Sequence, residues 1–186
     1  EGKRALTGAL NQANYNKLIQ AGVEVIDGMA SFVDATHVEV KTKDGVLQLE
    51  GKQFVINTGA TSVIPGIPGV KDSDKVYTSE SMMDLDELPE KLTIVGGGYI
   101  GLEFAAMYAN FGSKVTVVQD IDVFLPREDK DIADNIRSVL EAKGIEIVTG
   151  AKTTKIEGAT LYYTVGDTDT VLEGDAILMR SEEHTS

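Results

Sequence analysis

The spacing of apolar residues changes along this chain of 186 residues. Near the start, Leu6, Leu10, Leu18 and Ile19 recur close to helical spacing, and Gly22 follows them. This pattern predicts a first helix that ends at the glycine. Short runs rich in β-branched and aromatic residues then alternate with Gly, Asp and Lys turns, and they predict an antiparallel meander with a returning strand. The predicted strand runs are 23–34, 36–42, 46–51 and 52–59.

The next segment is rich in turn residues. Residues 60–70 contain two Pro-Gly pairs, and they predict a structured turn between two units. Residues 79–90 predict a short capped helix that ends before Pro89. We therefore expect a domain boundary near residues 88–91, which separates residues 1–90 from residues 91–179.

Strand-like and helix-like periods alternate from residue 91 onward. Such an alternation requires right-handed crossovers and a sheet that is covered on its faces. The predicted fold class is α/β, with a Rossmann-like parallel sheet that follows the antiparallel meander. The predicted elements are strand 92–96, helix 99–111, strand 114–119, helix 129–143, strand 145–149, and further short strands up to about residue 179.

Composition narrows the possible partners. The formal net charge is -13, with 17 Lys and Arg against 30 Asp and Glu, so we expect no binding to nucleic acid or anionic membranes. No apolar run approaches the roughly 20 residues that span a bilayer, and the start lacks the features of a secretory signal, so we expect a cytoplasmic protein. The chain has no cysteine, which excludes thiol chemistry from these residues alone.

The last seven residues, 180–186, break the strand pattern. They resemble the translation of a DNA-sequencing adapter, so we expect a non-native tail and exclude it from the fold. The alternative is a native acidic tail. We assign no metal site to this tail, although it contains Glu182, Glu183 and His184, and we expect none elsewhere in the chain.

Three glycines between a predicted strand and a predicted helix carry the main chemical signal. Gly96, Gly98 and Gly101 match the spacing G-x-G-x-x-G in this setting, which is typical of dinucleotide binding. The first glycine permits a tight turn, the second admits a pyrophosphate, and the third allows the helix to pack on its strand. The helix N-terminus then favours an anion. The alternative is a glycine turn that serves close packing alone.

The segment "VGGGYIGLEFA…FGSKVTVV" resembles the coenzyme-binding segment of the flavin-dependent pyridine nucleotide-disulfide oxidoreductases. That family includes glutathione reductase, dihydrolipoamide dehydrogenase and mercuric reductase. The resemblance covers residues 1–179, in the family's order of motifs, and is nearest to the hypothiocyanous acid reductase-like flavoproteins. It implies that residues 1–90 are the later part of an FAD domain and that residues 91–179 are an NAD(P) domain.

The resemblance also implies roles for single residues in FAD binding. The backbone at Ala30 would contact the adenine of FAD. Thr58 and Gly59 would line the flavin nucleotide, and Ser79 would lie near the same cofactor.

Tyr99 and Glu103 lie just beyond the glycines. The resemblance implies that Tyr99 covers the flavin and moves aside for nicotinamide, and that Glu103 pairs with a lysine beside the flavin. It also places Ile100 among the residues that bind NAD(P). The alternatives are a packed aromatic at Tyr99 and a glutamate at Glu103 that is solvated and favoured by the helix dipole.

The end of the second strand suggests the choice of coenzyme. Gln119 and Asp120 lie near the spacing expected of the ribose-binding acid after the glycine motif. By resemblance, a glutamate at the first of these positions would favour NADH and an arginine at the second would favour NADPH, and the chain has neither. Gln119 can accept a bond from a hydroxyl, and Asp120 repels a phosphate, so we expect a weak preference for NADH. The alternative is that Arg127 binds the phosphate of NADPH.

The function implied by the resemblance is hydride transfer from NAD(P)H to FAD and onward to a disulfide or a related oxidised small molecule. The family's redox cysteines and its C-terminal dimerisation domain have no counterpart in residues 1–179, so we expect a fragment of a homodimeric parent that is inactive alone. One alternative is a flavoprotein of the same fold without redox cysteines, such as an NADH oxidase or a ferredoxin-type reductase. The other is a non-catalytic nucleotide-binding or redox-sensing module.

Overall fold

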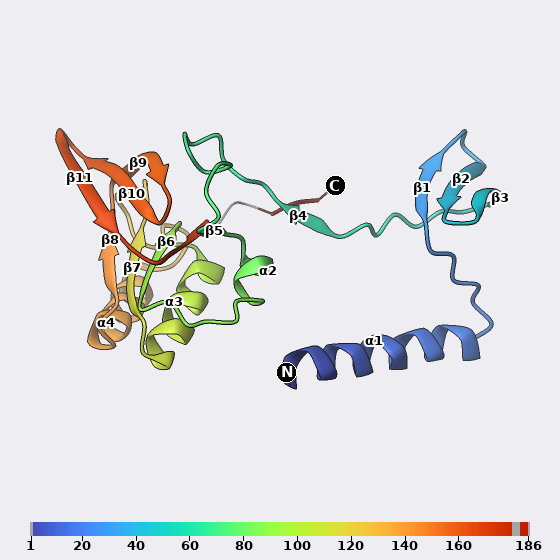
Figure 1. The fold of residues 1–186 in the computed structure, drawn as a ribbon, viewed down its shortest axis with the longest axis horizontal. Coiled ribbons are helices and arrows are strands. Elements are labelled where there is room, and N and C mark those ends of the chain that lie inside the picture. The colour runs from blue at the N-terminus through green and yellow to red at the C-terminus, as the bar shows by residue number, and fades with distance from the viewer. Residues whose placement is uncertain (1, 180–182, 186) are drawn as a thin grey trace. The chain divides into compact units, whose positions relative to one another are not determined.

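The computed structural model describes residues 2–179 and 183–185 (Figure 1). By its contacts the chain divides into two compact units, Glu1–Asn57 and Thr58–Ser186. The candidate site lies in the second unit, and each unit is described by itself.

The first unit contains a helix and a three-stranded meander. Helix α1 (Gly2–Gln20) carries no buried residue. It ends as predicted, because Gly22 adopts a φ of 75° and the Val23 N–H donates to the Leu18 carbonyl at 3.0 Å. Strands β1 (Met29–Phe32), β2 (His37–Thr42) and β3 (Gly45–Glu50) pair antiparallel in that order, which confirms the meander.

The returning strand predicted at 52–59 is wrong. These residues form no strand, and the short strand β4 (Ala60–Ser62) follows them and pairs with β13 (Glu183–Thr185). The side chains of Val55 and Ile56 are 94% and 70% exposed. An apolar run becomes a strand only when another strand satisfies its backbone groups, and sequence periodicity alone does not supply that partner.

The second unit is built on a five-stranded parallel sheet. Its order is β5-β12-β6-β7-β8, and every neighbouring pair is parallel, which confirms the predicted α/β class. The strands are β5 (Val76–Tyr77), β12 (Ala176–Met179), β6 (Lys91–Val95), β7 (Lys114–Val118) and β8 (Glu146–Val148). The predicted helices are confirmed as α3 (Tyr99–Phe111) and α4 (Lys130–Ala142).

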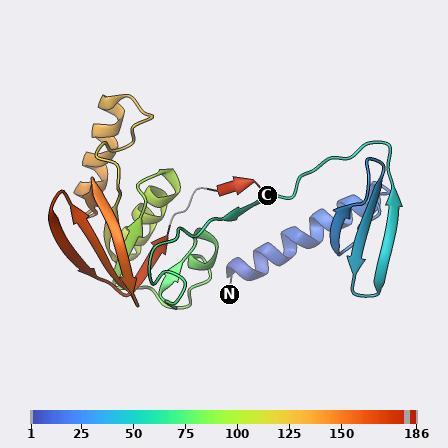
Figure 2. The ribbon, with the colours of Figure 1, turned by 90° about the horizontal axis from the view of Figure 1, so that it is seen from above.

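Both faces of this sheet are covered. Helices α3 and α4 lie on one face, and an antiparallel sheet lies on the other (Figures 1 and 2). That second sheet consists of β9 (Ala151–Glu157), β10 (Thr160–Val165) and β11 (Thr168–Glu173). Strand β12 shows the two-sided burial, because Ala176 and Leu178 join the core under the helices while Ile177 and Met179 join the core under the antiparallel sheet.

The segment before β6 packs against this unit. Thr78 caps the short helix α2 (Ser79–Met82) through a capping box with Ser81, as the sequence predicted. The Tyr108 hydroxyl of α3 donates to the Met82 carbonyl at 3.0 Å in a buried contact. The second unit therefore begins at Thr58 by its contacts. The boundary expected near residues 88–91 concerns how the chain divides between two cofactor domains, and it stays a prediction.

The tail at 180–186 is only partly described. Arg180, Ser181, Glu182 and Ser186 lie outside the described residues, and 183–185 form strand β13. The origin of the tail as a non-native segment stays a prediction.

Candidate nucleotide-binding site

A glycine turn joins β6 to α3 at the carboxyl end of the parallel sheet. Gly96 has a φ of 111°, a conformation that favours glycine, and its N–H donates to the Val118 carbonyl of β7 at 2.8 Å. A Cβ on Gly101 would overlap the carbonyl oxygen of Gly96 and would touch the Ile94 side chain at 3.4 Å. Strand, turn and helix can therefore approach this closely only with glycine at position 101.

The N-terminus of α3 is open to an anion. Gly98 is the N-cap residue in an extended conformation, with φ -80° and ψ 175°, and no side chain caps the helix. The N–H groups of the first helical turn have no carbonyl acceptor within the helix. Those of Tyr99, Ile100 and Gly101 therefore provide donors and a partial positive charge at the end of the glycine turn.

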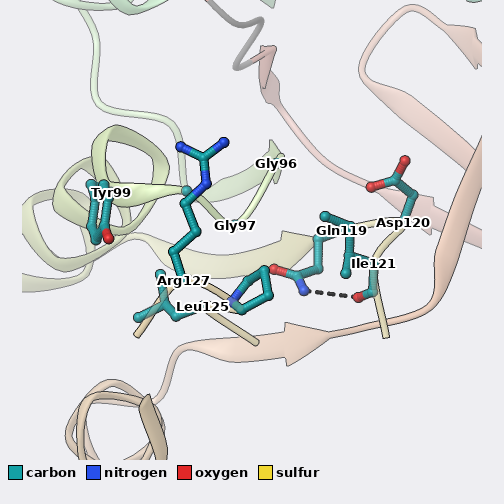
Figure 3. A pocket seen from close by; sticks show the side chains of 10 residues that line it. Gly96, Gly97, Tyr99, Gln119, Asp120, Ile121, Leu125 and Arg127 are labelled. Carbon is teal, nitrogen blue, oxygen red and sulfur yellow. Dashed lines mark hydrogen bonds between the residues drawn. The ribbon is translucent and has the colours of Figure 1, made fainter. Parts of the chain in front are cut away.

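A pocket of about 340 Å³ opens beside this turn (Figure 3). It lies beyond the carboxyl ends of β6 and β7, where ligands bind in open α/β sheets. Its walls come from the glycine turn on one side and from the segment after β7 on the other. The lining residues are Gly96, Gly97, Gly98, Tyr99, Gln119, Asp120, Ile121, Leu125, Pro126 and Arg127.

Gln119 lies at the base of this pocket and is only 7% exposed. Its side-chain amide donates to the Ile121 carbonyl at 2.8 Å and to the Val123 carbonyl at 3.0 Å. Its amide oxygen faces Gly97, where a Cβ would overlap that oxygen. The glycine motif assigned no role to Gly97. The run of three glycines was the one sequence feature that could have indicated this close approach.

Two opposite charges lie on different sides of the pocket. Figure 3 shows Asp120 at one side and the guanidinium of Arg127 at the other. Both side chains are exposed. The pocket can therefore repel a phosphate at its Asp120 side and attract one at its Arg127 side.

Tyr99 begins α3 and is 52% exposed. Its hydroxyl donates a hydrogen bond to the Glu128 carboxylate, and this bond raises the pKa of Tyr99 above its usual value because the neutral phenol is the donor. No pattern in the sequence relates the members of this pair, which lie 29 residues apart. Glu103 lies one turn after Tyr99 in α3 and is exposed.

The residues expected at the flavin fall in both units. Ala30 lies in β1 opposite Val40, in the first unit. Thr58, Gly59 and Ser79 belong to the second unit; Gly59 has a φ of 77°, and Ser79 is the first residue of α2. The FAD assignment of these four residues stays a prediction.

Within residues 2–179 and 183–185, no helix combines the length and the apolar character needed to cross a bilayer.

Comparison with known proteins gives one family. The family described as pyridine nucleotide-disulphide oxidoreductase matches residues 3–180. The chain is 41% identical over 180 residues to the probable pyridine nucleotide-disulfide oxidoreductase RclA of Escherichia coli, covering 96% of this chain and 41% of that protein. It is 38% identical over 161 residues to dihydrolipoyl dehydrogenase of Acholeplasma laidlawii, covering 85% of this chain and 47% of that protein.

A solved structure agrees with this result. The HOCl-induced flavoprotein disulfide reductase RclA from Escherichia coli superposes with a TM-score of 0.89 at 38% identity, covering 99% of this chain and 42% of that one. The chain therefore spans less than half the length of these relatives. With its glycine turn, open helix N-terminus and parallel sheet, the chain belongs to the pyridine nucleotide-disulphide oxidoreductase family.

Proposed function

We propose that this chain is the coenzyme-binding part of a flavin-dependent oxidoreductase, and that the pocket beside the glycine turn binds NAD(P)H. The observation that carries the proposal is the glycine turn that leads from β6 into the uncapped N-terminus of α3, at the edge of a pocket at the carboxyl ends of parallel strands. The similarity to a flavoprotein disulfide reductase supports the same reading.

The residues present fit a dinucleotide. The pyrophosphate would accept hydrogen bonds from the first-turn N–H groups of α3, and Gly98 would let it approach the backbone. The adenosine ribose would lie at the end of β7, beside Asp120. We infer a modest preference for NADH, because Asp120 disfavours a 2'-phosphate; at an exposed site the discrimination is roughly several-fold.

Within the whole enzyme, bound coenzyme would supply a hydride to bound FAD, and the two electrons would then pass to a disulfide-type substrate. The residues of this chain would bind and orient the coenzyme. The half-exposed ring of Tyr99, at the N-terminus of α3, would cover the flavin until nicotinamide enters. Glu103, on the same helix face, would hold a lysine beside the flavin.

Titration of the 186-residue chain with NADH, followed by the fluorescence of the coenzyme, tests this proposal. Gly98→Val places a branched side chain where the pyrophosphate would approach, and we expect it to abolish saturable binding. Gly66→Val is the matched control, because a Cβ at Gly66 meets no atom within 4 Å and the residue lies outside the pocket. Unchanged affinity in Gly98→Val would reject the proposed site.

A further inference from the structure

We propose that Gln119 is a positioning residue for the coenzyme: its buried amide fixes the loop that forms one wall of the pocket, and it does not read the ribose. We define the coenzyme loop as residues 120–129, between β7 and α4. The inference rests on the proposed function, and it assigns position 119 a different task from the ribose contact that its place after the glycine motif suggests.

Both donors of the Gln119 amide are already used. A primary amide has two N–H donors, and those of Gln119 go to the carbonyls of Ile121 and Val123 at 2.8 and 3.0 Å (Figure 3 draws the first of these bonds). The side chain is 7% exposed, so water competes little for these bonds. They close the bend immediately after β7.

The amide oxygen is also enclosed. It faces Gly97 so closely that a Cβ there would overlap it. The amide therefore fills the space between the glycine turn and the coenzyme loop. Although Gln119 lines the pocket, it is only 7% exposed, so little of its amide is open to a ribose hydroxyl.

The coenzyme loop depends on this anchor to shape the pocket. Half of the residues that line the pocket belong to the loop; they are Asp120, Ile121, Leu125, Pro126 and Arg127. The backbone adds a further tie, because the Gly150 N–H donates to the Ile121 carbonyl at 3.1 Å. The Gly150 bond would still hold Ile121, so release of the Gln119 bonds would act mainly through Val123 and loosen the wall that leads on to Arg127.

A glutamate cannot replace the amide in this role. An ionised carboxylate has no donor, and it would face the two carbonyl oxygens that the amide now binds. Asp120 and Asp122 flank the bend and oppose a further negative charge, while Arg127 on the pocket wall favours one. Gln119→Glu, the change that would ordinarily improve NADH binding, should therefore weaken it.

Two variants distinguish this positioning role from direct binding of the ribose by Gln119. Gln119→Glu removes the donors and adds a charge, and Gln119→Met removes the donors without a charge. We expect each to raise the Kd of both NADH and NADPH, by about tenfold for two lost hydrogen bonds, because both coenzymes would use the wall that the loop forms. Hydrogen exchange of residues 121–128 should accelerate in both, without comparable change in β6 or α3.

The pH dependence separates positioning from a general loss of fold. The carboxyl group that Gln119→Glu introduces can donate one hydrogen bond to the loop when it is protonated. Binding by this variant should therefore recover partly as the pH falls toward 5, because burial and the two carbonyl oxygens that face it raise the pKa of the new carboxyl. Gln119→Met should show no such recovery.

Tighter NADH binding by Gln119→Glu, with NADPH binding unchanged, would overturn the inference. If Gln119→Glu does not fold, the Gln119→Met variant decides: an unchanged Kd for both coenzymes, or unaltered hydrogen exchange in the loop, would contradict the positioning role. Absence of binding of either coenzyme by the unchanged chain would instead reject the proposed function, and this inference with it.

Discussion

Alanine at position 101 should destabilise the second unit although it replaces a helical glycine. Gly101 is buried near the start of α3. In an open helix, Gly→Ala stabilises by about 1 kcal/mol because alanine restricts the unfolded chain and favours helix. At Gly101 the new methyl would overlap the carbonyl oxygen of Gly96 and would meet the Ile94 side chain at 3.4 Å. The obstacle is backbone, so no rotamer change relieves it.

The expected magnitude follows from these opposing effects. Overpacking costs about 1–3 kcal/mol, and a clash with backbone belongs at the upper end of that range. After subtraction of about 1 kcal/mol for helix propensity, the net loss is about 2 kcal/mol. For a domain of this size each kcal/mol lowers Tm by roughly 3–5 °C, so Gly101→Ala should lower Tm by about 6–10 °C.

Thermal unfolding followed by circular dichroism measures this loss, and NADH titration of the same samples measures its effect on the site. Gly8→Ala is the matched control, since Gly8 lies in the exposed helix α1 and a Cβ there meets nothing within 4 Å. This control should leave the transition of the second unit unchanged and should slightly raise the helical signal. A Gly101→Ala protein with equal or higher Tm and unchanged NADH affinity would refute the packing argument.

Two further predictions concern other parts of the chain. Tyr108→Phe should reduce the free energy of unfolding of the second unit by about 1 kcal/mol in denaturant titrations, because it leaves the buried Met82 carbonyl without its donor; an unchanged midpoint would contradict this. Hydrogen bonds from the Thr36 backbone and from His37 lower the pKa of Asp34 to about 2, so the stability that Asp34 contributes is present above pH 3.8 and is lost as the pH falls from 3.8 to 2. An NMR titration of the Asp34 carboxyl should have its midpoint at about 2, a midpoint at 3.8 would contradict the prediction, and Asp34→Asn should remove this acid dependence.

The sequence predicted best where local signals and tertiary structure agree. The start of α3 at Tyr99 and its end before Gly112 followed from the glycines on either side, and Gly112 adopts the left-handed conformation that ends the helix. The parallel strands β6 and β7 also lie within one residue of the predicted ranges. For these elements the local pattern and the partners supplied by the parallel sheet agree.

The failures occur where partners decide the structure. The run at 52–59 has the composition of a strand, but composition does not specify which strand would pair with it. The contact between Tyr99 and Glu128 joins positions that no periodicity relates. Likewise, the bonds of Gln119 to the carbonyls of Ile121 and Val123 depend on the bend of the loop, which its spacing after the glycine motif does not show; the binding role of Gln119 stays a prediction.

The most direct test of the central claim is to map NADH on the folded chain by NMR. Two-dimensional amide spectra of the isotopically labelled 186-residue chain would be recorded during a titration with NADH. We predict saturable shifts of the amides of Gly97, Gly98 and Tyr99 to Gly101, together with Asp120, because the first group would bind the pyrophosphate and Asp120 would lie beside the ribose. Saturable shifts confined to residues outside this pocket, or no shifts at millimolar NADH, would contradict the account.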